Sequence, residues 1–106
     1  MSTTAPEFTA EALGERLFGA LIGTLELACV HVGDRLGLYE ALAQEGPLTS
    51  GEVAAARGLD ERYVREWLEQ QAVAGMIAVE DPSRSAADRR YALPAGHREA
   101  LLDPDS

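Results

Sequence analysis

The sequence has very little cysteine and no segment rich in positive charge. Its single cysteine, Cys29, excludes an internal disulfide and a cysteine-rich zinc site, and is typical of a reducing compartment. The net charge is −9, and residues 1–50, 51–75 and 76–106 are each negative. Nucleic acids and anionic membrane surfaces are therefore poor partners for the chain as a whole. Because the single cysteine is typical of a reducing compartment, we expect the chain in the cytoplasm.

The chain also lacks an uninterrupted apolar run of membrane-spanning length. The most apolar window, residues 17–32, contains Glu26 and falls short of the ~20 residues that cross a bilayer. We therefore expect a buried helix here and no membrane span. The first residues carry no positive charge ahead of an apolar run, so a secretory signal is not expected either.

Motifs that carry catalytic or cofactor chemistry are missing as well. No glycine-rich loop follows a predicted strand, which is the setting that binds phosphates and nucleosides. Cys29 and His31 are two residues apart and point about 200° from each other on a helix, so they cannot share a metal ion. Neither His31 nor His97 has a nucleophile or carboxylate that the sequence places beside it. We expect no catalytic, cofactor-binding or metal-binding residue in this chain, and a buried structural thiol at Cys29.

What the sequence does contain is enough apolar material for one modest core. It has 106 residues, of which 46% are hydrophobic, and this predicts a single domain. We expect residues 1–8 to be disordered, residues 9–102 to form the domain, and residues 103–106 to begin a linker.

An amphipathic helix is predicted to begin after Thr9, which is a suitable N-cap. It carries a broad apolar stripe at helical spacing. The stripe consists of Leu13, Leu17, Phe18, Leu21, Ile22 and Leu25. Glycines at 14, 19, 23 and 33 each cost about 1 kcal/mol relative to alanine inside a helix, which suggests breaks between short helices or close approach of another backbone. For Gly19 and Gly23, packing within the chain and a subunit interface both remain open.

The next segments read as a helix-turn-helix. A helix over residues 34–43, with a bend at Gly37, ends at Gly46 and Pro47. Thr49 and Glu52 form a capping box for a helix over about 50–57. Gly58 ends that helix, and Asp60 caps a second helix over about 61–74.

The second of these helices should turn one side toward the core and one toward solvent. Val64, Trp67, Leu68 and Ala72 are predicted to face inward, with Trp67 in the core. The outward side should present four charged residues. These are Arg62, Arg65, Glu66 and Glu69.

Two β-prone runs, residues 76–80 and 90–93, follow this helix and are joined by a polar loop. A short helix then ends near Leu102. The expected fold is therefore mainly α, a winged helix-turn-helix with N-terminal dimerisation helices and a small β-hairpin wing.

The charge of this unit does not suit a DNA reader. Specific binders take much of their affinity from basic residues on phosphates, but the second helix and its cap have a net charge of −2. The arginines of the wing are offset by Asp81 and Asp88. If the chain did bind DNA, five arginines would make the contacts. These are Arg62, Arg65, Arg84, Arg89 and Arg90.

Four blocks of sequence resemble the N-terminal winged-helix domain of bacterial class I S-adenosylmethionine-dependent methyltransferases of the O-methyltransferase type. The blocks are Glu15–Gly19, Gly33–Tyr39, Glu61–Ala72 and Arg90–His97, and Tyr63–Ala72 is the most specific part. The resemblance covers about residues 12–106. It implies a domain that serves dimerisation and closes over the substrate pocket as a lid.

The sequence departs from that family in lacking the catalytic domain with its glycine-rich cofactor motif, so no cofactor or catalytic residue carries over. S-adenosylmethionine is implied only for the missing domain. The leading hypothesis is a non-catalytic dimerisation and lid domain, a fragment or truncated form, whose partner is a second copy through the apolar stripe or its own catalytic domain. The alternatives are a small winged-helix transcriptional regulator and an adaptor that docks on a full-length relative.

Overall fold

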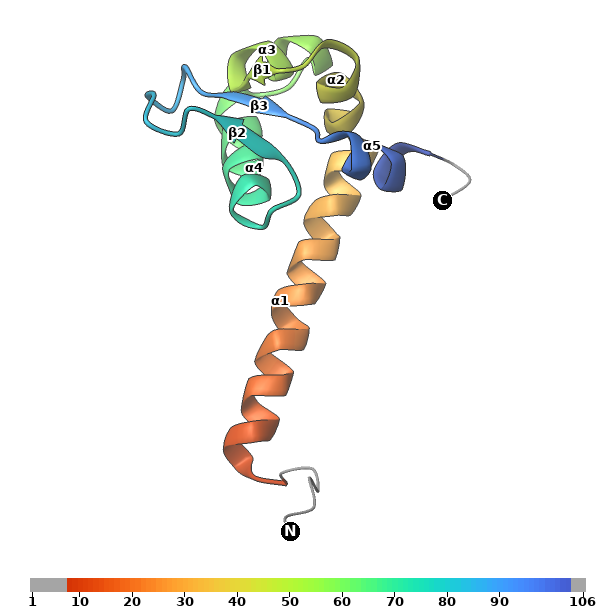
Figure 1. The fold of residues 1–106 in the computed structure, drawn as a ribbon, viewed down its shortest axis with the longest axis vertical. Helices are drawn as coiled ribbons and strands as arrows, with labels where there is room; N and C mark the ends of the chain where they lie inside the picture. The colour runs from red at the N-terminus through yellow and green to blue at the C-terminus, as the bar shows by residue number, and fades with distance from the viewer. Residues whose placement is uncertain (1–7, 104–106) are drawn as a thin grey trace.

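The structure is a computed structural model that describes residues 8–103. Figure 1 shows one long helix that projects from a small body. The body consists of the other four described helices and a sheet. The long helix, α1, runs without a break from Ala10 to Arg35, and the Thr9 hydroxyl accepts a hydrogen bond from the Ala12 amide (3.1 Å). The radius of gyration is 17.4 Å, whereas a compact chain of this length has about 13 Å. Most of α1 therefore has no neighbour among the other residues that the structure describes.

The glycines do not break α1, so breaks between short helices, one of the two explanations offered for them, are not observed. A Cβ added to Gly14, Gly19 or Gly23 would meet none of residues 8–103 within 4 Å, so these three glycines are not points of close approach in the described part of the chain. Gly33 is such a point, since its added Cβ would lie 2.3 Å from Cζ2 of Trp67. Intramolecular packing, one of the two possibilities for Gly19 and Gly23, is therefore not observed.

The length and composition of α1 alone would allow it to cross a membrane, and 6% of its apolar window is buried. The expected buried helix is therefore wrong, because this window is mostly exposed. A signal sequence near an N-terminus meets the same test of length and composition, so the finding is weak evidence for a membrane span.

A left-handed turn at Gly37 (φ 71°) separates α1 from α2, which runs from Leu38 to Glu45. The predicted helix over residues 34–43 was therefore misplaced, because α1 continues through Asp34 and the chain changes direction at Gly37. The Arg57 guanidinium donates from Nε to the Gly37 carbonyl oxygen (2.7 Å) and so joins this turn to the helix Ser50–Arg57. Helix α2 ends at Gly46, as expected.

The helix-turn-helix is formed by α3 (Ser50–Arg57) and α4 (Glu61–Val73). The capping box is confirmed: the Glu52 amide donates to the Thr49 hydroxyl (3.2 Å), and the Thr49 amide donates to Oε1 of Glu52 (2.9 Å). Gly58 adopts the left-handed conformation (φ 64°), and the Asp60 carboxylate accepts from the amide of Arg62 (2.9 Å). These local caps set where both helices begin and end.

The wing is a small antiparallel sheet of three strands in the order β1-β3-β2, followed by α5 (Ala95–Leu102). The strands are β1 (Leu48–Thr49), β2 (Ala78–Glu80) and β3 (Arg90–Ala92). Tyr91 pairs with Val79 on one side and Leu48 on the other. The hairpin is confirmed, while β1 was not predicted and β2 is shorter than expected. The mainly α winged helix-turn-helix fold is as the sequence predicts.

The core lies between α2, α3, α4 and the sheet. Tyr39 and Tyr91 are fully buried, and the Tyr39 hydroxyl donates to Oε1 of the buried Gln71. Trp67 is half-buried at the edge of this core, not inside it, and its ring meets that of Tyr39 edge-on with centroids 5.1 Å apart. Cys29 is likewise half-buried, so the expectation of a buried thiol was also wrong.

Candidate functional site

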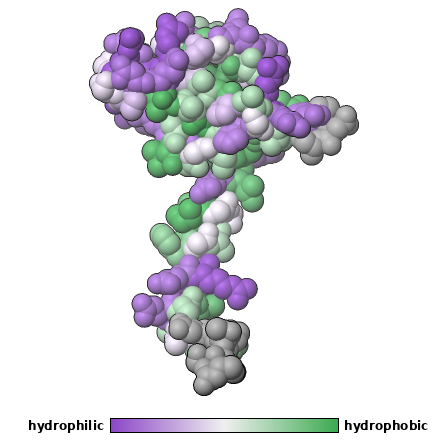
Figure 2. Space-filling view, in the orientation of Figure 1, coloured by the Kyte–Doolittle hydropathy of each residue, from purple (hydrophilic) through white to green (hydrophobic). Residues whose placement is uncertain are grey.

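The most unusual surface of the molecule is one side of α1. All six residues predicted for the apolar stripe lie on this helix, and their side chains are 40% to 64% exposed. Figure 2 shows hydrophobic residues along much of the helix outside the body, with hydrophilic residues near its N-terminal end. Soluble monomers rarely leave a continuous apolar surface of this kind open to water.

The stripe continues past the six predicted residues to the point where α1 joins the body. Val32 and Leu36 lie seven and eleven residues after Leu25, so they share its side of the helix, and both are exposed. This pair was not predicted as part of the stripe, although its spacing from Leu25 places it there. We call these eight residues the extended stripe. Leu27 is 71% exposed but lies on a different side of α1.

Trp67 holds the C-terminal part of α1 on the body. Its indole Nε1 donates to the Cys29 carbonyl oxygen (2.9 Å), and its ring lies against Gly33, which is the buried residue of α1. Residues 13–22 of α1 are exposed, whereas Cys29, Val30 and Gly33 are partly or fully buried, so the body contacts the helix chiefly in its last turns. The direction of the exposed part is therefore set by this junction.

The five arginines considered for DNA each face a carboxylate. The distances between nitrogen and oxygen atoms are 3.4 to 3.9 Å. The pairs are Arg62 with Glu66, Arg65 with Glu61, Arg84 with Asp81, Arg89 with Glu69, and Arg90 with Glu52. Such surface pairs add only about 0 to 1 kcal/mol each to stability, but they place negative charge where phosphates would bind.

Two of the carboxylates that face these arginines, Glu52 and Asp81, have lowered pKa values. Hydrogen bonds from the Thr49 amide and hydroxyl, with the nearby Arg90 guanidinium, hold the pKa of Glu52 below its usual range. Hydrogen bonds from Ser83, with a smaller contribution from Arg84, lower the pKa of Asp81 in the wing. Glu52 and Asp81 therefore stay negatively charged to lower pH than ordinary carboxylates.

Within residues 8–103 no group of three or more His, Cys, Asp or Glu side chains could hold a metal ion. His31 is exposed on α1, and Nδ1 of His97 lies 2.7 Å from the Met76 carbonyl oxygen. The described residues do not fit S-adenosylmethionine either. The glycines with positive φ are Gly37, Gly58 and Gly75, and each follows a helix, whereas a nucleoside-binding loop follows a strand.

The Rv2258c-like winged helix-turn-helix domain family matches residues 23–103. The chain belongs to this family. The match takes in the C-terminal half of α1, the helix-turn-helix and the wing. A search of the curated proteins found no relative of this Rv2258c-like domain.

Among solved structures, the Rv2258c-like domain is similar to the mitomycin 7-O-methyltransferase MmcR, with 32% identity and a TM-score of 0.70. It is also similar in fold to human N-acetylserotonin methyltransferase, with 18% identity and a TM-score of 0.59. In both cases 89% of this chain aligns with 26% of the methyltransferase, so it spans about a quarter of their length. These likenesses agree with the resemblance drawn from the sequence.

A third structure, of Bordetella bronchiseptica BpsR, concerns the regulation of DNA binding by 6-hydroxynicotinic acid. Here 94% of this chain aligns with 74% of BpsR at 16% identity and a TM-score of 0.52. At that identity the likeness concerns the fold alone. The Rv2258c-like domain therefore shares its winged-helix fold with proteins of two different functions.

Proposed function

We propose that the chain is the non-catalytic dimerisation and substrate-lid domain of an S-adenosylmethionine-dependent O-methyltransferase. The likeness to a quarter of MmcR supports the assignment to such an enzyme. The extended stripe on α1 is the observation that carries the dimerisation role. S-adenosylmethionine would be bound by a catalytic domain and not by the residues described here.

The free energy available from covering the stripe is of the size that a dimer needs. Full burial of a leucine or phenylalanine side chain contributes about 1.5 to 3 kcal/mol, so a half-exposed one contributes about 1 kcal/mol more when covered. In a two-fold dimer every stripe residue counts twice, which gives on the order of 10 kcal/mol or more. Association costs about 4 to 15 kcal/mol in lost freedom of motion. The gain is therefore comparable with the cost of association, so a dimer has to cover most of the extended stripe in order to form.

Sedimentation of the intact chain at tens of micromolar tests this proposal. The wild type is expected to sediment as a dimer, and Leu21→Glu, in the middle of the stripe, as a monomer with unchanged helix content. Leu27→Glu is the matched control, because it makes the same change on another side of α1 and should remain dimeric. A wild type that is strictly monomeric at these concentrations would remove the dimerisation role.

The catalytic silence of the chain has its own test. Calorimetric titration of the intact chain with S-adenosylmethionine should give no binding heat. Saturable binding would contradict the assignment of the cofactor to another domain.

A DNA-binding regulator is the alternative, and the ion pairs of the helix-turn-helix face speak against it. Arg62 and Arg65 on α4 are each paired within the same helix, and the arginines of the wing are paired as well. A DNA phosphate that binds these arginines would have to displace the carboxylates or lie close to their negative charge. We therefore assign the helix-turn-helix to contacts with protein and not with nucleic acid.

A further inference from the structure

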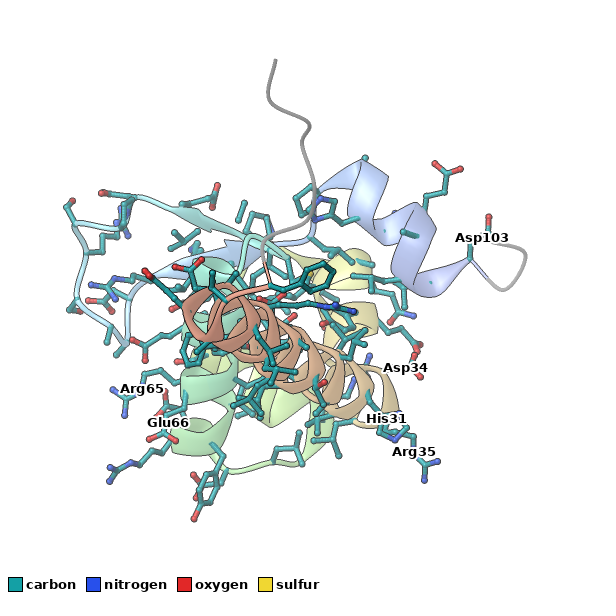
Figure 3. All side chains as sticks on the ribbon, turned by 90° about the horizontal axis from the view of Figure 1, so that it is seen from below. His31, Asp34, Arg35, Arg65, Glu66 and Asp103 are labelled. Carbon is teal, nitrogen blue, oxygen red and sulfur yellow. The ribbon has the colours of Figure 1, made fainter. Side chains whose placement is uncertain are left out.

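The extended stripe ends in a groove where α1 meets α4. The groove has a volume of about 260 Å³ and lies between the last turns of α1, the turn before α4 and the first half of α4. Its lining consists of Val32, Leu36, Leu38, Leu59, Asp60, Tyr63, Val64 and Trp67. In Figure 3, which looks along α1, His31 and Arg35 lie on the side of α1 away from α4, and Arg65 and Glu66 lie beyond α4. These charged side chains are not part of the lining.

Two polar groups of the lining are already used by the fold, and the Tyr63 hydroxyl is a third polar group on an exposed side chain. The Asp60 carboxylate caps α4 by accepting from the amides of Arg62 (2.9 Å) and Tyr63 (3.4 Å). The Trp67 indole N–H donates to the Cys29 carbonyl oxygen. The remaining surface is aliphatic and aromatic, so the groove suits an apolar occupant and not an anion or a sugar.

The groove is continuous with the surface proposed for dimerisation. Val32 and Leu36 belong both to the extended stripe and to the groove wall. Tyr63, on the opposite wall, is 73% exposed and widens the same apolar surface across to α4. A second copy that covers the stripe therefore also covers the groove.

The shape of the groove determines whether the two α1 helices of a dimer run parallel or antiparallel. If the two α1 helices of a dimer packed in parallel, each residue would meet the same residue of the partner subunit. The two grooves would then face each other and leave an unfilled space between them. If the helices pack antiparallel, the convex N-terminal half of one α1 lies on the groove of the other. Packing at interfaces is as dense as in protein interiors, which favours the antiparallel arrangement.

The length of the stripe then sets the register. The extended stripe runs from Leu13 to Leu36, so two copies that cover it fully have their two-fold axis near residue 25. In that register Phe18 of the partner subunit lies opposite Val32. Phe18 is also the largest side chain of the stripe and is 64% exposed.

We propose that the groove at the base of α1 receives Phe18 of the partner subunit, so that the two α1 helices of a dimer run antiparallel. This proposal rests on the proposed dimerisation role, and it adds the direction, the register and the contact that fills the groove. Each body then buries the end of the other chain's long helix.

Disulfide trapping in the intact chain tests the arrangement. With Cys29→Ser as background, two further variants carry Phe18→Cys or Val32→Cys. In the antiparallel register the two Phe18 positions of a dimer are about 21 Å apart along the helices, far beyond the Cα separation of about 4.4 to 6.8 Å that a disulfide bridges. Each single variant should therefore remain uncrosslinked under mild oxidation, and an equimolar mixture that has exchanged subunits should give covalent heterodimers.

The outcomes separate this proposal from the dimerisation role. Cross-linking of Phe18→Cys with itself, or a dimeric mixture without heterodimer cross-links, overturns the antiparallel register while the dimer stands. Variants that sediment as monomers, together with a monomeric wild type, overturn both.

Trp67 provides a second measurement that needs no substitution in the groove, because it is the single tryptophan of the chain. Its fluorescence should shift to longer wavelength and become more easily quenched by acrylamide when the dimer is diluted to monomer. Phe18→Asp should show the monomer signal at every concentration, whereas Leu27→Asp should follow the wild type. Equal quenching in dimer and monomer would mean that the groove stays open to small molecules, and it would overturn the proposal.

Discussion

Trp67 donates a hydrogen bond from its indole Nε1 to the carbonyl oxygen of Cys29 and so joins α4 to α1 across 2.9 Å. The same ring covers Gly33, one turn further along α1, and meets Tyr39 of α2 edge-on. One half-buried side chain thus connects the long helix to the core. The position of the exposed stripe relative to the helix-turn-helix depends on it.

This junction predicts opposite effects for two glycine substitutions in α1. Gly33→Ala would place a Cβ 2.3 Å from the Trp67 ring, and the forced shift should destabilise the fold by about 1 to 3 kcal/mol. Gly19→Ala meets nothing within 4 Å and should stabilise the helix by up to about 1 kcal/mol. Urea unfolding of both variants at one protein concentration measures the difference. Equal stability of the two variants would show that the ring contact at Gly33 is not rigid.

Burial of Tyr39 predicts a loss of stability at alkaline pH. Desolvation raises the pKa of Tyr39 to about 12, and its hydroxyl donates to the buried Gln71. In the unfolded chain the pKa is about 10, so between pH 10 and 12 the folded state binds more protons than the unfolded state. Stability therefore falls as pH rises through this interval, by an amount on the order of 2 kcal/mol.

Tyr39→Phe tests this assignment. It should cost about 1 to 3 kcal/mol at neutral pH, because the Gln71 side chain loses a buried partner, and it should remove much of the alkaline loss. Tyr91, whose pKa is also raised chiefly by burial, should leave a smaller remaining slope. Tyr63→Phe, on an exposed side chain, is the control, and unfolding at pH 8 and pH 11 is the measurement. An unchanged alkaline slope in Tyr39→Phe would contradict the prediction.

The parts of the fold that the sequence predicts are those whose causes lie within a few residues. Thr49 and Glu52 satisfy each other's backbone amides, and Gly58 and Asp60 act on the next turn, so the helix-turn-helix could be located from its local pattern. Strand β1 could not, because two residues form a strand only through their pairing with β3, far along the chain.

Breaks in the long helix were considered as one of two explanations for its glycines because each glycine was weighed by its local cost alone. Leu13, Leu17, Leu21 and Leu25 keep the same spacing across Gly14, Gly19 and Gly23, and a continuous stripe is better evidence for one helix than single glycines are for breaks. The six stripe residues were therefore found from spacing. The groove was not, because it exists only where the last turns of α1 meet Tyr63 and Trp67 of α4.

The capping box predicts a stability change on the acid side. The folded-state pKa of Glu52 is lowered, first by the amide and hydroxyl of Thr49 and then by Arg90. Its contribution is therefore present above the pKa of the unfolded chain and is lost as pH falls through the lower folded value. Glu52→Gln keeps an acceptor for the Thr49 amide but removes the charge, so its stability should fall less steeply below about pH 4.5 than that of the wild type.

Glu45→Gln, at an exposed carboxylate at the end of α2, is the matched control and should keep the wild-type acid profile. Unfolding between pH 3 and pH 7 makes the comparison. A wild-type profile in Glu52→Gln would mean that the cap does not depend on charge.

The ion pairs of the helix-turn-helix face predict that DNA binding is absent and can be created. The wild type should not shift a random duplex at low salt, where electrostatic attraction is strongest. Glu66→Gln together with Glu69→Gln removes the carboxylates that face Arg62 and Arg89, so this double variant should bind duplex weakly and release it as salt is added. Glu11→Gln with Glu15→Gln changes the net charge equally on α1 and should not bind. Steeply salt-dependent binding by the wild type itself would instead favour the DNA-binding regulator, because DNA phosphates would then displace the carboxylates.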